Sequence, residues 1–305
     1  MLRKPIGNYY VGITRYQTKA FGKEENIRKI PYTIYYPSNE TGEEAPYVNV
    51  DYIYSKKEGK LRDNGVHTFC YRNVPLLPSE NKYKVIIFSH GLNGYEMECT
   101  VLCADLASLG YVVVAIGHPV GSPILSYEDG SFSEWQQPEA ISKTQLIELL
   151  LLWKEDFERV MDQLEELPFA NQLRLTEFDL LGMSLGGNAA ILAGLSDTKN
   201  RIEHVINLDG RLFLLPEIIT HQPEIMTYCG RFSILAYQKL QNIHYQKLQI
   251  MIRKGLTHYH FSDGLFLSEK GKENPDWADR ERMNRILTIK NFLEKRNRKK
   301  ISNLE

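Results

Sequence analysis

A serine stands in a glycine-rich turn that is typical of a nucleophile. Gly182-Met183-Ser184-Leu185-Gly186-Gly187 follows a short apolar stretch at 178–181 and precedes a helical pattern at 189–195. In a strand-turn-helix context, the Gly-x-Ser-x-Gly spacing indicates a nucleophile elbow, a tight turn that lifts the serine above a sheet. Because three fixed positions alone are a weak signal, the prediction depends on partners elsewhere in the chain.

The predicted base is His258. A serine hydroxyl is a poor nucleophile at neutral pH and needs a base, which itself needs an orienting carboxylate. With such an elbow the chain order is serine, acid, histidine. His258 follows the last predicted strand, 248–252, and is favoured over His260, the serious competitor. The other histidines after Ser184 begin a strand or lie in a polar segment and fit less well: His204, His221 and His244.

The predicted acid is Asp209. It is the first carboxylate after the apolar run 204–208, and Gly210 relaxes the turn that follows. Strands of a parallel sheet carry active residues at their carboxyl ends, which is where Asp209 stands. The other acids either lie inside a strand or fit less closely: Asp179, Asp263, Glu217 and Glu224.

Two backbone N–H groups are predicted to stabilise an oxyanion. One belongs to Leu185, the residue after the nucleophile, which is the usual first donor. The second is assigned to Leu92, in the loop Ser89-His90-Gly91-Leu92-Asn93-Gly94 that follows an early strand. Its glycines let the backbone turn N–H groups inward. His90 itself is interpreted as a buried structural histidine.

Short apolar runs alternate with helical patterns along the chain. The runs predict strands at 28–38, 84–88, 111–116, 178–181, 204–208 and 248–252. Helical spacing predicts helices at 102–109, 141–167 and 189–195, and a C-terminal helix through 283–293. Fully apolar strands suit a sheet that is covered on both faces. The fold class is therefore α/β, with a central, mostly parallel sheet and helices on both faces.

We expect a single domain over 1–305 with three excursions, at about 39–82, 122–145 and 211–246. The first is polar and is predicted to have weak structure. The other two are candidate covers over a pocket. Their aromatic residues are candidate lining residues: Phe132, Trp135 and Phe213.

Composition excludes some partners. The formal net charge of −1 provides no basic field for nucleic acid. The four cysteines form no C-x-x-C pair, and Cys99 and Cys103 are interpreted as small apolar residues on one helix face rather than metal ligands. Neither a signal peptide nor an apolar run long enough for stable membrane insertion is evident. We therefore predict a cytoplasmic protein with no metal and no cofactor. Its oligomeric state is left open.

Several segments together resemble the platelet-activating factor acetylhydrolase family of α/β-hydrolases. They cover most of the chain in the right order: Tyr10-Val11-Gly12-Ile13-Thr14, Ile34-Tyr35-Tyr36-Pro37-Ser38, the stretch KYKVIIFSHGLNG from Lys82 to Gly94, Ala104-Asp105-Leu106-Ala107-Ser108-Leu109-Gly110-Tyr111, the elbow GMSLGG, Leu208-Asp209-Gly210, and His258 with Phe261-Ser262-Asp263. The resemblance implies an α/β-hydrolase fold, a metal-free serine esterase and short acyl groups. Met183 and the segment 211–246 depart from the family pattern.

The residues predict a serine hydrolase, and the resemblance implies that its substrates are esters with short acyl groups. We expect a serine hydrolase that cleaves short-chain carboxylic esters of small molecules, such as acetyl esters, through an acyl-enzyme. Ser184, Asp209 and His258 are its catalytic residues, and Leu92 and Leu185 donate to the oxyanion. The alternatives are a peptidase or amidase of the same fold, and a non-catalytic binding module.

Overall fold

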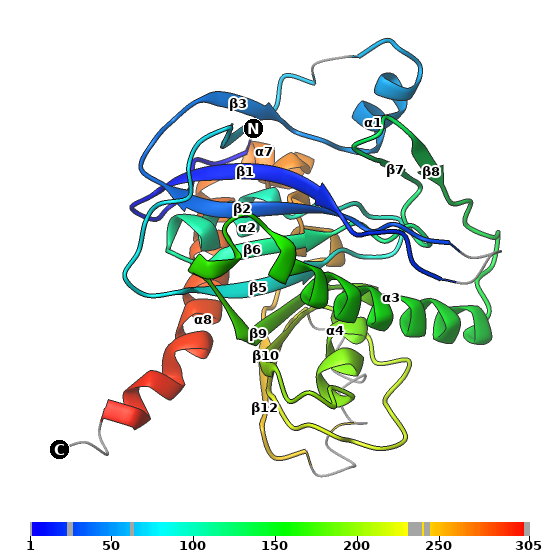
Figure 1. Ribbon diagram of the computed structural model, residues 1–305, viewed down its shortest axis with the longest axis vertical. Coiled ribbons are helices and arrows are strands. Elements are labelled where there is room, and N and C mark those ends of the chain that lie inside the picture. The colour runs from blue at the N-terminus through cyan, green and yellow to red at the C-terminus, as the bar shows by residue number, and fades with distance from the viewer. Residues whose placement is uncertain (1, 23–26, 62–63, 231–239, 241–244, 302–305) are drawn as a thin grey trace.

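A ten-stranded sheet runs through the protein in the order β12-β11-β10-β9-β5-β6-β2-β1-β4-β3 (Figure 1). The computed structural model describes residues 2–22, 27–61, 64–230, 240 and 245–301, with side chains as far as 294. Strands β12 to β6 in that order are parallel, and β2 pairs antiparallel with β6 and β1. The strand bounds are β1 Tyr10–Gln17, β2 Pro31–Ser38, β3 Glu43–Pro46, β4 His67–Arg72, β5 Tyr83–Ser89, β6 Val112–Ile116, β9 Leu173–Met183, β10 Ile202–Leu208, β11 Glu224–Cys229 and β12 Leu248–Ile252.

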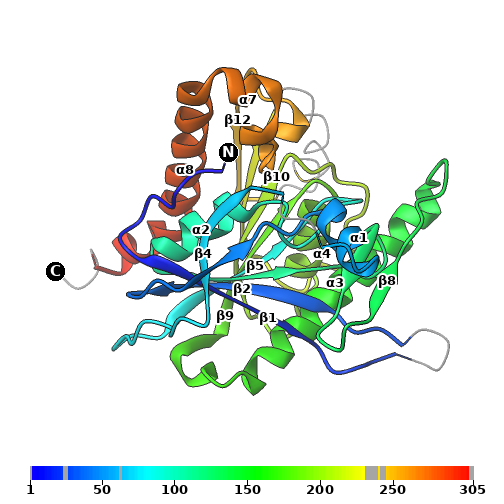
Figure 2. The same ribbon diagram turned by 90° about the horizontal axis from the view of Figure 1, so that it is seen from above.

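Helices cover both faces of this sheet (Figure 2). Helices α3 (Lys143–Gln163) and α4 (Leu185–Leu195) pack on one face, and α2 (Thr100–Ser108) and α8 (Pro275–Ile301) pack on the other. The predicted α/β class is therefore confirmed. The shorter helices are α1 Val50–Lys57, α6 Gly264–Leu267 and α7 Glu269–Glu273. Among the described residues, no helix combines the length and the apolar character needed to cross a membrane.

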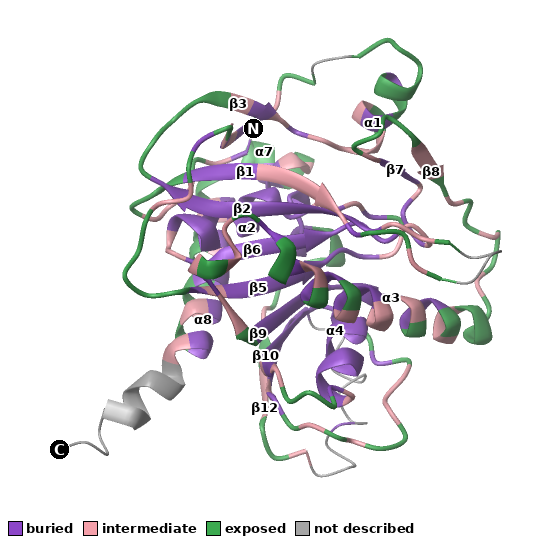
Figure 3. Ribbon diagram, in the orientation of Figure 1, coloured by how far each residue is buried: buried purple, intermediate pink, exposed green. Residues whose placement is uncertain are grey.

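Strand β5 shows why the sequence forms a two-sided core. Val85 and Ile87 contribute to the core under α3 and α4, whereas Ile86 and Phe88 contribute to the core under α2 and α8. Successive side chains of a strand point to opposite faces, so a continuous apolar run fills both cores. The central strands are accordingly buried along most of their length (Figure 3).

Helix α3 lies within the predicted helical segment 141–167 and presents an apolar stripe to the sheet. Ser142 caps its first turn by accepting from the backbone of Gln145, while the Gln145 side chain accepts from the Ser142 N–H, forming a capping box. The stripe is buried against the sheet at Leu149, Leu150, Trp153, Phe157, Val160 and Met161. The helix ends at Gln163, four residues before the predicted end, and continues as a short 3-10 turn at Leu164–Glu166.

Two of the expected excursions contain strands of the main sheet. The prediction of weak structure over 39–82 is wrong, because β3, α1 and β4 lie there and β4 pairs with β1. The segment 211–246 contains β11, which lies between β10 and β12. Strand β4 is half-exposed near the sheet edge, so its sequence shows only a weak apolar pattern. Strand β11 carries the polar residues Glu224 and Thr227 and lies in a polar segment, so its sequence does not read as an apolar run. The segment 122–145 carries a hairpin, β7 (Ile124–Ser126) and β8 (Phe132–Glu134).

A buried ion pair joins α2 to α8. The Arg282 guanidinium donates to both carboxylate oxygens of Asp105, at 2.8 and 2.5 Å, and to the carbonyl of Lys4. Asp105 also accepts from the backbone of Ile6. Burial raises the pKa of Asp105, and the hydrogen bonds from Arg282 oppose that shift. The pair therefore fastens the N-terminal segment and α8 to one face of the sheet.

We predict that Arg282→Ala lowers the free energy of unfolding by about 3–5 kcal/mol, because it leaves the Asp105 carboxylate buried without its partner. The double variant Arg282→Met with Asp105→Leu should lose markedly less, since no charge then stays buried. Urea unfolding followed by circular dichroism measures both. Equal losses in the two variants would contradict the role assigned to the pair.

Candidate active site

The elbow holds Ser184 in a backbone conformation that few side-chain-bearing residues adopt. Ser184 has φ 56° and ψ −120°, between the end of β9 and the start of α4. The flanking glycines are required by space. A Cβ on Gly182 would lie 2.2 Å from the carbonyl oxygen of Gly186, and one on Gly186 would lie 2.3 Å from that of His90. A Cβ on Gly187 would lie 2.0 Å from Oδ1 of Asn207. The Gly-x-Ser-x-Gly-Gly pattern is thus a steric condition for the turn.

The structure brings Ser184, His258 and Asp209 together. Nε2 of His258 lies 2.9 Å from Oγ of Ser184, and Nδ1 of His258 lies 2.7 Å from Oδ2 of Asp209. Asp209 is buried after β10, and its Oδ1 accepts from the N–H of Gly230 at 2.8 Å. With Nδ1–H donating to Asp209, Nε2 is left as the acceptor for the serine proton. The His258 side chain stays 53% exposed, so it is open to a substrate.

His260 points elsewhere. Its Nδ1 accepts from the N–H of Thr257 at 3.0 Å, and its ring packs edge-on against Trp277 at 5.1 Å. It is buried, and burial lowers its pKa. Of the two competing histidines, only His258 therefore reaches the serine.

In the loop after β5, one of three successive N–H groups has no acceptor among the described residues. The N–H of Gly91 donates to Oε1 of Glu98 at 3.0 Å, and that of Asn93 donates to the carbonyl of Gly121 at 2.8 Å. Between them, the N–H of Leu92 has no acceptor among the described residues. Leu185 begins α4, so its N–H has no partner within the helix. Both leucines line one cavity with Ser184.

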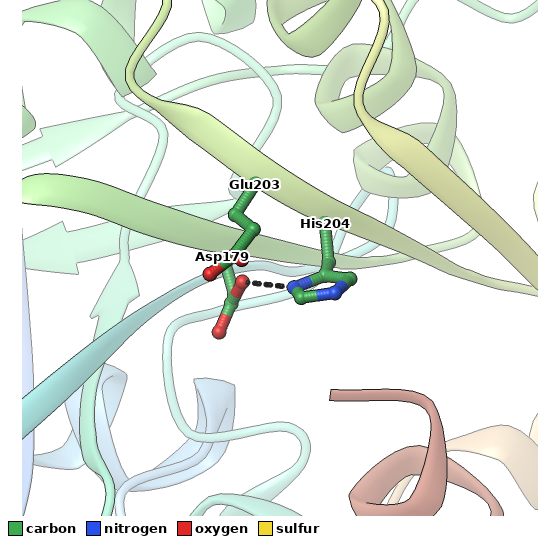
Figure 4. A group of neighbouring side chains, drawn as sticks. All are labelled: Asp179, Glu203 and His204. Carbon is green, nitrogen blue, oxygen red and sulfur yellow. Dashed lines mark hydrogen bonds and ion pairs between the residues drawn. The ribbon is translucent and has the colours of Figure 1, made fainter. Parts of the chain in front are cut away.

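Most of the acids and histidines considered as alternatives to Asp209 and His258 make hydrogen bonds or ion pairs elsewhere in the fold. Asp179 accepts from Nδ1 of His204 at 2.7 Å, between β9 and β10 (Figure 4). The carboxylate of Glu203 lies close to this pair, and the Lys84 ammonium lies 3.8 Å from Glu203. The side chains of this cluster are therefore already paired, Asp179 with His204 and Glu203 with Lys84.

The remaining alternatives are also accounted for. Asp263 accepts from the N–H groups of Thr100 and Val101, so it caps α2 rather than a turn beside His258. Nε2 of His221 donates to the carbonyl of Ile202 at 2.5 Å. Glu217 is exposed, Glu224 begins β11, and His244 lies outside the described residues.

A second serine–histidine–aspartate chain lies inside the protein. Oγ of Ser89 is 2.8 Å from Nε2 of His118, whose Nδ1 is 2.8 Å from Oδ2 of Asp156. All three side chains are buried, and the His118 ring stacks on Trp153 at 4.0 Å. Burial holds the pKa of His118 well below its usual value. No substrate reaches this serine, so the chain is a structural one that sequence reasoning did not find.

His90 belongs to this buried network. Its Nδ1 donates to the carbonyl of Gly91 at 2.6 Å, and its Nε2 accepts from the N–H of His118 and lies 2.9 Å from Oγ of Ser122. Burial lowers the pKa of His90 to about 3, so the ring is neutral. The interpretation of His90 as a structural histidine is confirmed, and the ring braces the loop that carries Leu92.

Two cavities flank Ser184 and His258. The leucine-lined cavity has a volume of about 350 Å³ and is lined by Leu92, Leu146, Ser184, Leu185, Asp209, Arg211, Phe213, Gly230, Leu256, Thr257 and His258. The tyrosine-lined cavity has a volume of about 460 Å³ and includes Tyr47, Tyr95, Glu98 and Tyr259. Phe213 lines the first, as expected. Phe132 and Trp135 line neither cavity, and no other residue of the segment 122–145 is among the lining residues.

Comparison with known proteins identifies the family. The family model for platelet-activating factor acetylhydrolase, isoform II, matches residues 1–167. The chain belongs to this family. The match includes the loop of Leu92 and ends before the elbow, so Ser184, Asp209 and His258 lie outside it. A platelet-activating factor acetylhydrolase of Canis lupus familiaris is 27% identical over 88% of this chain and 69% of that protein.

A solved structure supports the fold. A ferulic acid esterase from Streptomyces cinnamoneus superposes with a TM-score of 0.71 at 21% identity, over 88% of this chain and 81% of that one. At this identity the likeness concerns the fold alone, which is an α/β-hydrolase fold. Family membership and fold together identify an ester hydrolase of the α/β-hydrolase type.

We predict that His258→Ala lowers kcat by about 10⁵–10⁶, because Ser184 then has no base. His260→Ala should cost far less in kcat and should act mainly on stability, since it removes a buried ring from Trp277. Steady-state hydrolysis of p-nitrophenyl acetate, with thermal melting of each variant, separates the two effects. A large kcat loss in His260→Ala with little loss in His258→Ala would reverse the assignment.

Proposed function

We propose that the protein is a serine esterase that cleaves short-chain acyl esters of small molecules through an acyl-enzyme. The observation that carries this is the bonding of Ser184 to His258 and of His258 to Asp209, at 2.9 and 2.7 Å, between two open cavities. The buried chain of Ser89 has similar distances and lacks such access, so access sets Ser184 apart.

In the proposed reaction, Oγ of Ser184 attacks the ester carbonyl carbon while Nε2 of His258 takes the hydroxyl proton. The carbonyl oxygen becomes an anion and accepts from the N–H groups of Leu92 and Leu185. Asp209 holds the ring and stabilises the imidazolium. The C–O bond of the ester then breaks, and the alcohol leaves with the proton from His258. Water attacks the acyl-serine with help from the same ring and releases the acid.

The proposal of a short acyl group has two supports. The matched family and the canine relative are both described as acetylhydrolases. Leu92 and Leu185 both border the leucine-lined cavity, so the acyl carbon that faces them extends into it. Leu146, Phe213 and Leu256 bound this cavity at about 350 Å³. Methylenes that extend beyond these walls into water gain no burial energy.

We predict that a fluorophosphonate probe labels the wild-type protein and the Ser89→Ala variant at Ser184, and leaves Ser184→Ala unlabelled. The hydroxyl of Ser184 borders both cavities, whereas that of Ser89 is buried. Intact-mass and peptide mass spectrometry identify the labelled residue. A wild-type protein that stays unlabelled would favour a non-catalytic binding module instead.

We predict that kcat/KM for p-nitrophenyl esters peaks at the acetyl or butyryl ester and does not rise further as the acyl chain lengthens to decanoyl. The reason is that the matched family and the canine relative are both described as acetylhydrolases. The p-nitroanilide of acetic acid should be turned over far more slowly than the acetate ester. Steady-state rates across the series measure both preferences. A rate that rises steadily to decanoate would contradict the short-acyl proposal, and an anilide rate near that of the ester would favour the amidase.

A further inference from the structure

The peptide group between Gly91 and Leu92 is held by its carbonyl oxygen. That oxygen accepts from Nδ1–H of His90 at 2.6 Å and from the N–H of Gly94 at 3.0 Å, so both of its lone pairs are used. The peptide bond is trans, and its carbonyl and its N–H therefore point in opposite directions. Holding the carbonyl thus fixes the direction of the Leu92 N–H, which has no acceptor among the described residues.

The tautomer of His90 is decided by the segment 118–122. A backbone N–H can only donate, and that of His118 donates to Nε2 of His90 at 3.1 Å. The hydroxyl of Ser122 lies 2.9 Å from the same nitrogen. Burial lowers the pKa of His90 to about 3, so the ring is neutral and carries one hydrogen. Because Nε2 accepts, that hydrogen is on Nδ1, where it bonds the carbonyl of Gly91.

The same segment also holds the loop on the other side of Leu92. The carbonyl of Gly121 accepts from the N–H of Asn93 at 2.8 Å. Gly121 has φ 119°, and a Cβ on it would lie 2.5 Å from the ring of Trp153, so this position requires glycine. The segment 118–122 therefore contacts the loop before and after the predicted oxyanion donor.

Helix α3 holds the segment in turn. Nε1–H of Trp153 donates to the carbonyl of Val120 at 2.7 Å. Oδ2 of Asp156 lies 2.8 Å from Nδ1 of His118, and the His118 ring stacks on Trp153 at 4.0 Å. Two residues of one helix thus fix the backbone and the ring that bond the loop of Leu92.

The charge on Asp156 sets the direction of the hydrogen bonds around His118. Burial raises the pKa of Asp156 to about 7, and the Arg28 guanidinium, 3.0 Å from Oδ1, opposes that shift. At pH 8 the carboxylate is therefore ionised and accepts from Nδ1–H of His118. Nε2 of His118 is then left to accept from the hydroxyl of Ser89 at 2.8 Å. Both ring nitrogens are satisfied in a single orientation, which fixes the backbone N–H of the same residue.

We propose that the buried serine–histidine–aspartate chain positions the oxyanion donor of Leu92 through the ring of His90. This inference rests on the proposed esterase function, because the oxyanion belongs to that reaction. Asp156 orients His118, and His118 orients His90, so the three are positioning residues that act on the substrate only through the Leu92 peptide. The bond from His90 to the carbonyl also polarises that peptide, which strengthens its N–H as a donor.

The test compares p-nitrophenyl acetate with its thiono analogue, in which sulfur replaces the carbonyl oxygen. Sulfur is a weaker acceptor than oxygen, so a fixed N–H donor stabilises the transition state of the oxygen ester more strongly. The measured quantity is kcat/KM for the oxygen ester divided by that for the thiono ester, at pH 8. A variant that only loosens the fold slows both esters alike and leaves this ratio unchanged.

Asp156→Ala removes the acceptor that orients His118. We expect kcat for the oxygen ester to fall by about 10–100-fold with KM nearly unchanged, which is less than the loss of a whole donor costs. The ratio should fall by a similar factor. Asp156→Asn keeps an oxygen for Nδ1–H of His118 and should retain most of the wild-type ratio. Ser122→Ala removes only the hydroxyl beside His90 and should lower the ratio by about threefold.

Asp179→Ala is the matched control. Asp179 accepts from Nδ1 of His204 at 2.7 Å, so this change also takes a buried carboxylate from a buried histidine, at a site between β9 and β10. We expect it to lower Tm, as Asp156→Ala does, and to keep the wild-type ratio. Thermal melting of each variant accompanies the rate measurements.

An unchanged ratio in Asp156→Ala overturns the positioning role, as does an equal fall in Asp179→Ala. Should Asp156→Ala fail to fold, an unchanged ratio in Ser122→Ala overturns it instead. A wild-type ratio no higher than the ratio of the uncatalysed rates overturns it as well. In each of these cases Ser184-dependent hydrolysis of p-nitrophenyl acetate still supports the esterase. If the wild-type protein hydrolyses neither ester, the proposed function fails and the positioning role with it.

Discussion

The left-handed backbone at Ser184 is the constraint on which the rest of the site depends. Only a turn this tight carries the chain from β9 into α4 while the hydroxyl stays above the sheet. Gly182 and Gly186 make the turn sterically allowed, and β5 lies against it through Ser89 and His90. The loop of Leu92 therefore meets the N-terminus of α4 at a fixed place, where Leu92 and Leu185 line one cavity.

Access, more than hydrogen-bond geometry, distinguishes the two serine–histidine–aspartate chains. Ser89 and His118 are as close as Ser184 and His258, yet the first pair lies under α3 against Trp153. There the bonds satisfy buried polar groups, which would otherwise be costly. Ser184 borders two cavities, and His258, which lines both, is half-exposed. The same three residue types thus stabilise the core in one place and line a cavity in the other.

The carboxyl groups near the site have different environments and different roles. Asp209 receives hydrogen bonds from His258 and from the N–H of Gly230. Asp263 receives two from the start of α2, so the turn that follows His258 is fixed to that helix. Glu98 has one bond to the loop of Leu92 and an oxygen without a partner among the described residues. The three carboxyl groups thus differ in the donors that surround them.

The sequence by itself determined the α/β class, the elbow, and the order of serine, acid and base, because apolar periodicity and glycine positions are local properties. It did not predict β4 and β11. These two strands form by pairing with β1 and β10, and that pairing is a property of the folded protein. Only the tertiary structure decided between His258 and His260, and only it revealed Glu98 and the chain of Ser89. Those distinctions depend on contacts between segments far apart in sequence and on burial, which no local pattern records.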